Sequence, residues 1–345
     1  MFRRLAKWLH RTRQSVLWIG SIGLLACSGA PVQSGTSDRL DPDTEIAPFV
    51  SELVSRHGFE PERLERILGG VRVRPDVLEA IARPAESLDW YQYRPIFLTE
   101  TRIARGEKFW RAHADTLAAA SREYGVSAEI IVAIIGVETL YGTRKGKHLV
   151  LDSLATLAFR YPRRSKFFRS ELEQFLLLAQ QEGFNTPKVK GSYAGAMGIP
   201  QFISSSYRRY AVDFDGDGVR DLLGSDTDAI GSVANYLKKH GWQRDGAVAL
   251  PASVSGDKYK ALVKKGMKPN TPVSDMHNFG VVVLYASDNE SPGALIELTN
   301  KNDSEHWVGL QNFYAITRYN HSSLYAMAVF QLAREIRKRY SGVEG

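Results

Sequence analysis

The sequence has little cysteine and no strong excess of charge beyond its first residues. Cys27 is the only cysteine in 345 residues, so the chain cannot close a disulfide within itself. The eight histidines are scattered and none lies in an H-E-x-x-H pattern, which leaves no case for a zinc site. The net charge of +7 falls to +2 without residues 1–26, which carry five basic residues and no acid. That balance is too weak to indicate a nucleic acid as partner.

The sequence also lacks an apolar run long enough for a membrane span. The run "VLWIGSIGLLA", residues 16–26, is shorter than the roughly 20 residues that a spanning helix needs. It follows a basic stretch, which is typical of an export signal. With Cys27 directly after it, the segment resembles a bacterial lipoprotein signal, which implies cleavage before Cys27 and a lipid on that residue. By the same resemblance, Ser28 favours the periplasmic face of the outer membrane. An ordinary secretory signal with an incidental cysteine is the alternative.

The remaining sequence has the composition of a soluble globular protein, with 43% hydrophobic and 24% charged residues. Its length predicts two or three packed lobes. Apolar residues recur at helical spacing over most of the chain and give way to short β-rich runs near residue 250. We therefore expect a mainly α protein of the α+β class. The expected parts are a signal at 1–26, a flexible tether at 27–46, a helical lobe at 47–126, a helical core at 127–249, a small β-containing lobe at 250–310 and a C-terminal helical part of the core at 311–345.

Several individual helices are predicted by apolar periodicity and by their end signals. A single long amphipathic helix is expected over 100–125, where Gly125 would end it, and Ser127 would cap the next helix. We expect Asp152 to be a helix cap rather than a catalytic acid. Further helices are expected at 152–160, 165–182, 226–241 and 322–340.

One carboxylate stands at the end of an apolar helical pattern in "IIVAIIGVETLYG", residues 130–142. Three isoleucines lie seven, four and three residues before Glu138, so on a helix they share its face. If that face is buried, desolvation disfavours the charged form and raises the pKa of the carboxyl. A carboxyl that stays protonated near neutral pH is what general-acid cleavage of a glycosidic bond needs. A glutamate that reaches solvent, or pairs with Arg144 or Lys145, is the alternative.

Other segments strengthen the catalytic interpretation because they form an ordered set of motifs. Together they resemble the lytic murein transglycosylase B family of lysozyme-like enzymes, over about residues 90–340. The resemblance implies a lysozyme-like core with a helical lobe, a small β-containing lobe and an EF-hand-like loop. The segments that carry it are "VETLYG", "YPRRSKFF", "KGSYAGAMGIPQF", "DFDGDGVRDL", "DAIGSVANYLKKHGW" and "ITRYNHSSLYAMAV".

The resemblance implies that Glu138 is the single catalytic acid and base. It would protonate the oxygen between N-acetylmuramic acid and N-acetylglucosamine, and then accept a proton from the muramic acid 6-hydroxyl as that oxygen attacks the anomeric carbon. The product is a 1,6-anhydro ring and no water is consumed. Ordinary glycosidases use two carboxylates, roughly 5–10 Å apart. The motifs contain no convincing second carboxylate, although a distant aspartate folded into the site is not excluded by the sequence.

The segment "KGSYAGAMGIPQF", residues 190–202, is rich in small residues that allow the backbone to approach a ligand closely. By resemblance, Ser192 and Gln201 line the cleft beside the acid and hold acetamide groups of the sugars, and Phe202 supplies an apolar wall. A structural glycine-rich turn with Gln201 on its surface is the alternative.

Aromatic residues are expected to complete the cleft, because their faces suit the C–H faces of sugar rings. Any one of these tyrosines is as readily a core residue. By resemblance, Arg163 and Arg164 in "YPRR" lie near the peptide stem and pair with its carboxylates, and a solvated basic turn is the alternative. The further residues that match the family cleft are Tyr93, Tyr236, Tyr319, Asn320 and Tyr325.

A loop that begins at Asp213, "DFDGDGVRDLLG", matches the EF-hand pattern D-x-D-x-D-G. Its twelfth position is Gly224 and not the usual glutamate, and the resemblance implies a longer loop that ends at a later aspartate. We expect structural calcium here, with sodium in some conditions, and an acidic turn without metal is the alternative. The predicted ligands are Asp213, Asp215, Asp217, the Val219 carbonyl and, by resemblance, Asp228.

The sequence as a whole predicts a lipid-anchored periplasmic enzyme that cleaves peptidoglycan glycan strands without hydrolysis. No cofactor is expected for catalysis. The expected partners are the glycan strands, the membrane through the lipid anchor and other cell-wall enzymes, and the protein is expected to be a monomer. A muramidase that hydrolyses the same bond, and a peptidoglycan-binding lipoprotein without activity, are the two rival interpretations.

Overall fold

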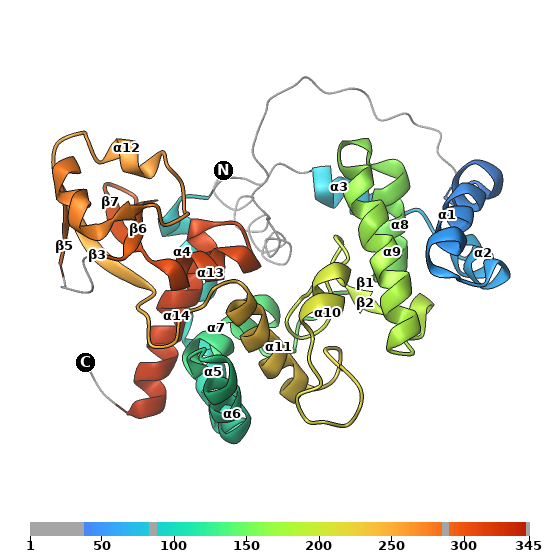
Figure 1. Ribbon diagram of the computed structural model, residues 1–345, viewed down its shortest axis with the longest axis horizontal. Coiled ribbons are helices and arrows are strands. Elements are labelled where there is room, and N and C mark those ends of the chain that lie inside the picture. The colour runs from blue at the N-terminus through green and yellow to red at the C-terminus, as the bar shows by residue number, and fades with distance from the viewer. Residues whose placement is uncertain (1–37, 83–87, 285–289, 343–345) are drawn as a thin grey trace, which may run out of the picture.

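The computed structural model describes residues 38–82, 88–284 and 290–342, which form a mainly helical protein with one small β lobe (Figure 1). The predicted signal, Cys27 and most of the predicted tether lie outside the described residues. Within the described ranges, no helix is both long and apolar enough to cross a membrane.

The central helices surround α7 (Ala128–Thr139), in which every residue from Ile130 to Thr139 is buried. A helix that is apolar on all sides is stable only when other elements cover it completely. Helices α5, α6, α11 and α14 pack directly against it, and α4 and α13 pack against α14. The surrounding helices are α4 (Trp90–Phe97), α5 (Glu100–Ala112), α6 (Ala114–Tyr124), α11 (Asp226–Lys239), α13 (Gln311–Tyr319) and α14 (Ser323–Ser341).

A second helical group lies on the right in Figure 1, where α8 and α9 pack against each other and α3 packs against α8. One hydrophobic core cluster contains residues from this group and from the central helices. The group consists of η2 (Pro42–Ile46), α1 (Ala47–His57), α2 (Pro61–Gly69), α3 (Pro75–Ala82), α8 (Val150–Arg160), η3 (Pro162–Arg164), α9 (Ser165–Gln181), η4 (Thr186–Lys188) and α10 (Ser204–Tyr210).

A short antiparallel pair, β1 (His148–Leu149) with β2 (Lys190–Gly191), brings the start of the glycine-rich segment beside the chain that follows α7. Gly146 has φ +94, and a Cβ there would lie 2.1 Å from the Gly191 carbonyl oxygen. Only glycine therefore allows these two backbone segments to approach so closely.

The β lobe contains one antiparallel sheet in the strand order β4-β6-β7-β3-β5, on the left in Figure 1. It has a small hydrophobic cluster of its own, and Trp307 on β7 packs edge-to-face against Phe330 on α14. Its elements are β3 (Ala249–Val254), α12 (Lys260–Val263), β4 (Thr271–Pro272), η5 (Val273–Phe279), β5 (Val281–Val283), β6 (Pro292–Thr299) and β7 (Ser304–Gly309).

Two local predictions are wrong, and a third is correct in position only. The expected helix over 100–125 breaks at His113, where α5 ends and α6 begins: both pack against α7, but α5 also packs against α14 and α6 against α11. Ser127 stands at the N-cap of α7, but its side chain accepts no capping hydrogen bond. Asp152 lies inside α8 rather than at its cap, and its carboxylate accepts a hydrogen bond from the Arg72 N–H at 3.2 Å.

The described end of the predicted tether, residues 38–46, is packed rather than loose. Leu40 and Ile46 are buried, and Glu45 forms an ion pair with Arg160 on α8. The predicted lobe at 47–126 is also divided in the structure, since α3 packs against α8 whereas α4 and α5 pack against α14. The order of the helices in the sequence did not indicate that neighbouring helices would pack against different parts of the protein.

Candidate active site and metal-binding loop

Glu138 lies in the last turn of α7 with its side chain in the protein interior, 8% exposed. Burial raises the pKa of its carboxyl to about 8, and a hydrogen bond from the Tyr325 hydroxyl at 2.5 Å acts in the opposite direction. The carboxyl is therefore protonated at neutral pH.

The alternative ion pair with Arg144 or Lys145 does not form. The Lys145 ammonium donates to the Leu223 carbonyl at 2.6 Å, and no basic residue within the described ranges forms an ion pair with Glu138. The carboxyl group thus has a single strong polar contact, which comes from a tyrosine.

Four tyrosines from four helices surround this carboxyl. Burial is the main reason that their pKa values are raised, and the nearby Glu138 charge adds to it in each case. The rings of Tyr319 and Tyr325 are nearly parallel, with centroids 6.5 Å apart, and Tyr236 lies 4.8 Å from Tyr319. We call Glu138, Tyr93, Tyr236, Tyr319 and Tyr325 the acid cluster; these tyrosines come from α4, α11, α13 and α14.

The glycine-rich segment is attached to the acid cluster through its C-terminal end. The Tyr319 hydroxyl donates to the Pro200 carbonyl at 2.6 Å, and the Phe202 ring lies 5.7 Å from the Tyr319 ring. Gln201 has a left-handed backbone, with φ +52, which is costly for a residue with a side chain. Its amide donates to the carbonyls of Lys145 and Gly198, so the strained residue is held in place from two sides.

Ser192 lies at the other end of this segment and is also buried. Its hydroxyl accepts a hydrogen bond from the Ala196 N–H at 3.0 Å, and its own N–H donates to the Ala196 carbonyl. Met197 then bridges to Phe202. These bonds fold the segment back on itself, so that Ser192 and Gln201 belong to one compact turn.

Asn320 follows Tyr319 at the end of α13, and its side-chain oxygen Oδ1 is buried without a hydrogen-bond partner among the described residues. A buried amide oxygen without a donor is uncommon in a folded protein. An acceptor left open beside the acid cluster is suited to an N–H or O–H donor of a ligand.

Arg163 and Arg164 are placed differently from the tyrosines. Within the described ranges, no hydrogen bond, ion pair or ring contact joins either residue to the acid cluster. The Arg164 guanidinium lies over the rings of Phe167 and Phe168, at 4.2 and 5.2 Å from their centroids, and Arg163 is exposed.

Sequence reasoning missed two aromatic residues that extend the cluster. The His240 ring stacks on Tyr236 with centroids 4.0 Å apart, and Tyr210 packs edge-to-face against Tyr236 at 4.9 Å. The four-residue spacing of Tyr236 and His240 on one helix could have indicated the stack. The contact with Tyr210 on α10 had no signal in the sequence.

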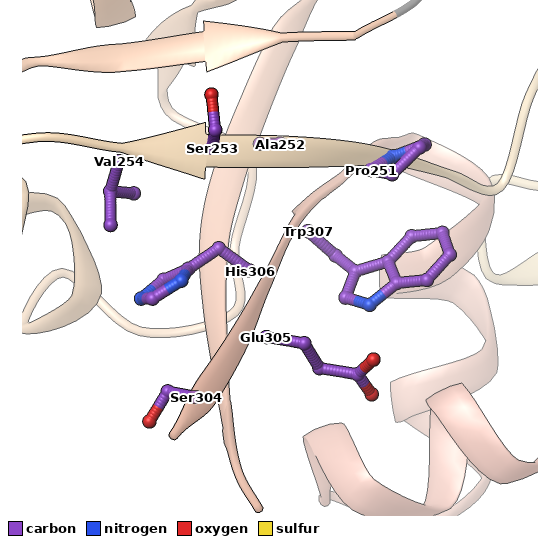
Figure 2. A pocket seen from close by; sticks show the side chains of 8 residues that line it. All are labelled: Pro251, Ala252, Ser253, Val254, Ser304, Glu305, His306 and Trp307. Carbon is purple, nitrogen blue, oxygen red and sulfur yellow. The ribbon is translucent and has the colours of Figure 1, made fainter.

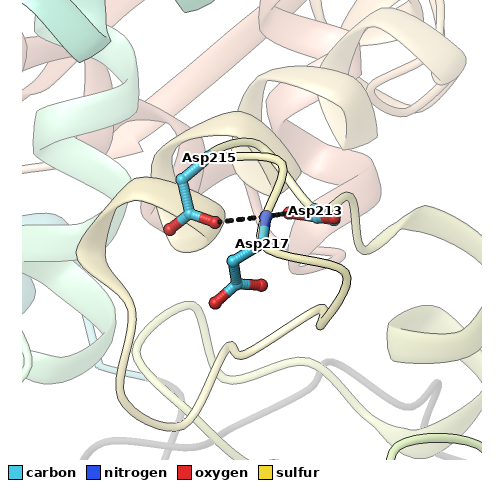
Figure 3. Close-up of side chains that lie close together, drawn as sticks. All are labelled: Asp213, Asp215 and Asp217. Carbon is cyan, nitrogen blue, oxygen red and sulfur yellow. Dashed lines mark hydrogen bonds between the residues drawn. The ribbon is translucent and has the colours of Figure 1, made fainter.

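The predicted metal loop gathers three aspartates at its tip (Figure 3). Carboxylate oxygens of Asp213, Asp215 and Asp217 all lie within 4.8 Å of one another. Asp213 accepts hydrogen bonds from the N–H groups of Gly216, Asp217 and Gly218, which shape the turn. Three oxygen ligands on a short loop fit a hard cation such as calcium.

Asp228 lies beneath the loop and not in this three-residue group. The residue is buried, and its carboxylate accepts hydrogen bonds from the N–H groups of Phe214 and Asp221, both at 2.7 Å. Burial raises its pKa, and the charges of Asp215 and Asp213 add to the effect. Asp228 therefore braces the loop through the backbone. Val219, the predicted carbonyl ligand, has an exposed side chain.

A separate pocket of about 400 Å³ opens between β3 and β7 in the β lobe (Figure 2). Trp307 and Glu305 point to one side of β7, and His306 points to the other, as expected for alternate residues of a strand. None of the residues that line this pocket belongs to the acid cluster.

The chain matches the family model described as "Transglycosylase SLT domain" over residues 41–334. It is similar to the membrane-bound lytic murein transglycosylase B of Escherichia coli (strain K12). The two sequences are 41% identical over 298 residues, which cover 84% of this chain and 81% of the relative.

Several solved structures are similar in both sequence and fold. The soluble lytic transglycosylase SltB1 from Pseudomonas aeruginosa is 46% identical with a TM-score of 0.82, covering 86% of this chain and 99% of that chain. The Escherichia coli lytic transglycosylase Slt35 in complex with calcium is 38% identical with a TM-score of 0.79, covering 88% and 99%. SltB3 from Pseudomonas aeruginosa in complex with NAG-NAM-pentapeptide is 33% identical with a TM-score of 0.76, covering 84% and 78%.

Proposed function

The chain belongs to the family of lytic transglycosylases with a transglycosylase SLT domain, and we propose that Glu138 is the acid and base of its reaction. The protein is a peptidoglycan lytic transglycosylase. It cleaves the β-1,4 bond between N-acetylmuramic acid and N-acetylglucosamine without water and leaves 1,6-anhydromuramic acid ends. The observation that carries the proposal for Glu138 is its burial, which keeps the carboxyl protonated at neutral pH.

In the first step, the Glu138 carboxyl gives its proton to the glycosidic oxygen as the bond from that oxygen to the anomeric carbon breaks. In the second step, the resulting carboxylate accepts the proton of the muramic acid 6-hydroxyl while the 6-oxygen bonds to the anomeric carbon. The proton is thus returned to Glu138 and no water is consumed. The Tyr325 hydroxyl, which donates to Glu138, stabilises the carboxylate between the two steps.

A single carboxylate is sufficient for this route if the substrate's own acetamide stabilises the positive charge that develops at the anomeric carbon. Among the described residues, no other carboxylate is close enough for its charge to raise the pKa of Glu138. This supports a mechanism with one acid rather than the carboxylate pair of ordinary glycosidases.

The proposed substrate-binding residues form three groups according to their side chains: polar, aromatic and basic. Ser192, Gln201 and Asn320 offer polar atoms for the acetamide groups of the sugars. Phe202 and the tyrosines of the acid cluster supply ring faces for the sugar rings. Arg163 and Arg164 are proposed to meet the carboxylates of the peptide stems; the complex of SltB3 with a pentapeptide-bearing disaccharide supports a ligand of this kind.

The loop at 213–228 is proposed to bind structural calcium, with sodium as a weaker occupant. Asp213, Asp215, Asp217 and the Val219 carbonyl are the proposed ligands, with Asp228 as a further candidate beneath them. The complex of the similar Slt35 with calcium supports the choice of metal. The ion would hold the loop between α10 and α11 and take no part in the chemical steps.

A lipid anchor at Cys27 is proposed to hold the enzyme on the periplasmic face of the outer membrane. The membrane-bound relative from Escherichia coli supports a membrane association. The enzyme is proposed to act as a monomer on glycan strands and to meet other cell-wall enzymes there.

The test of the catalytic proposal compares Glu138→Gln with Glu129→Gln. Glutamine keeps the shape of residue 138 and removes the transferable proton. Glu129 lies at the other end of α7, where it forms an ion pair with Arg337, so its variant controls for a change in the helix. We expect at least a thousandfold loss of peptidoglycan cleavage in Glu138→Gln and less than a twofold change in Glu129→Gln. Comparable activity in the two variants would rule out Glu138 as the acid.

A further inference from the structure

Arg102 on α5 is a buried cation without an acidic partner. The side chain is 5% exposed, and no carboxylate of the described residues forms an ion pair with it. Its guanidinium instead donates three hydrogen bonds to main-chain carbonyls. Nη1 donates to Ile96 at 2.5 Å and to Phe97 at 3.2 Å, and Nε donates to Gly136 at 3.1 Å.

These carbonyls belong to the C-terminal ends of two helices that carry functional residues. Ile96 and Phe97 end α4, which carries Tyr93 one turn earlier. Gly136 lies two residues before Glu138 in the last turn of α7. The Gly136 carbonyl also accepts from the Leu140 N–H at 3.2 Å, and the Phe97 carbonyl from the Thr99 N–H at 3.0 Å, so the guanidinium is a second donor to each. A cation is favourable at this end of the helix dipole. A single guanidinium therefore caps both helix ends at once.

The chain that follows Glu138 folds back onto the same arginine. Leu140 and Tyr141 have left-handed backbones, with φ +50 and +58, and the Tyr141 hydroxyl donates to the Arg102 carbonyl at 3.0 Å. A Cβ at Gly106 or Gly136 would lie 2.5 or 2.4 Å from that hydroxyl oxygen, so two glycines leave the slot that the tyrosine fills. Two consecutive strained residues are retained where the surrounding contacts fix the geometry closely.

Burial of an unpaired cation is costly, and an apolar side chain of similar size would fill this position at a lower cost. An apolar side chain, however, could not form hydrogen bonds to the ends of both α4 and α7. We propose that Arg102 is a positioning residue of the reaction, which sets Glu138 against Tyr93 by holding the ends of α7 and α4 on one guanidinium. This inference rests on the proposed role of Glu138 as the acid.

The test compares Arg102→Lys with Arg105→Lys in the full chain on soluble glycan strands. Lysine keeps the charge, but its ammonium is a single point and cannot meet carbonyls on both helices with the geometry of the guanidinium fork. Arg105 is exposed on the same helix and serves as the matched control. We expect kcat to fall 10- to 100-fold in Arg102→Lys, as a displaced catalytic group predicts, and to change less than twofold in Arg105→Lys.

The pH profile separates positioning from a structural role. The alkaline limb of kcat/KM reports loss of the Glu138 proton, whose pKa burial raises to about 8. Displacement of Glu138 toward water would move this limb to lower pH in Arg102→Lys. A lower melting temperature with kcat and the limb unchanged in the folded protein would overturn the inference.

Arg102→Met provides a second variant in case Arg102→Lys does not fold. It removes all three guanidinium hydrogen bonds and leaves an apolar side chain of similar length, which a buried position accommodates. We expect kcat to fall and the alkaline limb to move to lower pH, as in Arg102→Lys, and an unchanged kcat with an unmoved limb would overturn the inference. Glu138→Gln is measured in parallel: if it retains activity, the proposed function and this inference both fail, whereas an inactive Glu138→Gln with unchanged Arg102 variants rejects the inference alone.

Discussion

At the scale of the residue, the proposed chemistry depends on the burial and the protonation of one carboxyl group. Glu138 is one of ten consecutive buried residues of α7, and the Tyr325 hydroxyl is its only hydrogen-bonding partner among the described residues. Burial favours the proton on Glu138, and the tyrosine favours the carboxylate. Because these two effects oppose each other, the Glu138 carboxyl can both give and accept a proton near neutral pH.

The first residue-scale prediction concerns stability. The pKa of Glu138 is raised from 4.5 in the unfolded chain to about 8 in the folded protein, so the folded state retains a proton that the unfolded state loses. This contribution to stability is fully present below pH 4.5 and is lost as the pH rises through 8. Glu138→Gln should therefore be more stable than the wild type at pH 9, by on the order of 5 kcal/mol at most, with little difference at pH 4.5. Urea unfolding at the two pH values tests this. The same difference in unfolding free energy between variant and wild type at both pH values would contradict the prediction.

The second residue-scale prediction concerns Tyr325. Tyr325→Phe removes the donor that lowers the pKa of Glu138, so the carboxyl should hold its proton to higher pH. We expect the alkaline limb of kcat/KM to move up by about one pH unit, the size of one hydrogen bond to a charged group. Tyr314→Phe, a tyrosine of α13 outside the acid cluster, is the control. A limb that stays in place would show that the tyrosine does not act on this carboxyl.

At the scale of the element, most helices were predictable from apolar spacing and from glycine at their ends. The helices α9, α11 and α14 agree with that pattern within a few residues. The break of the 100–125 helix at His113 was not predictable, because no proline or glycine marks it in the sequence, and the separate contacts of α5 with α14 and of α6 with α11 appear only in the structure. Asp152 was misassigned for the same reason, since its bond to Arg72 joins residues 80 positions apart.

The prediction at this scale concerns the proposed calcium-binding loop. Calcium should raise the melting temperature of the wild type, because an ion that binds only the folded state stabilises it by about 2.7 kcal/mol at a concentration 100 times its dissociation constant. Asp215→Asn removes a proposed ligand and should abolish the shift. Asp257→Asn, which alters an exposed aspartate of the β lobe, should keep it. Thermal unfolding with calcium and with a chelator measures the effect. A calcium shift that survives in Asp215→Asn would place the ion elsewhere.

At the scale of the whole molecule, the helices are not grouped in sequence order. Helices α4 and α5 join α7 and α14 around the acid cluster, while α3 packs on α8. The acid cluster brings together residues from 93 to 325 on five helices, which local periodicity could not reveal. The family resemblance identified those residues, but the structure was needed to show their mutual contacts.

The prediction at this scale concerns how much the packed segment at 38–46 contributes to the stability of the protein. The comparison is between a chain that begins at residue 38 and one that begins at residue 47. A chain that begins at residue 47 loses the burial of Leu40 and Ile46 and the ion pair of Glu45 with Arg160, and should be about 3–5 kcal/mol less stable. Urea unfolding of the two truncated chains measures the difference. Equal stability would show that this segment is a loose tether after all.

The central claim is that Glu138 alone, without a catalytic water, cleaves the glycan strand. Mass spectrometry of the products from purified peptidoglycan, with the wild type and Glu138→Gln side by side, tests it most directly. The account predicts anhydro-muropeptides from the wild type and none from the variant. Products with a reducing muramic acid end would contradict it, because they would require a water molecule and a second catalytic group.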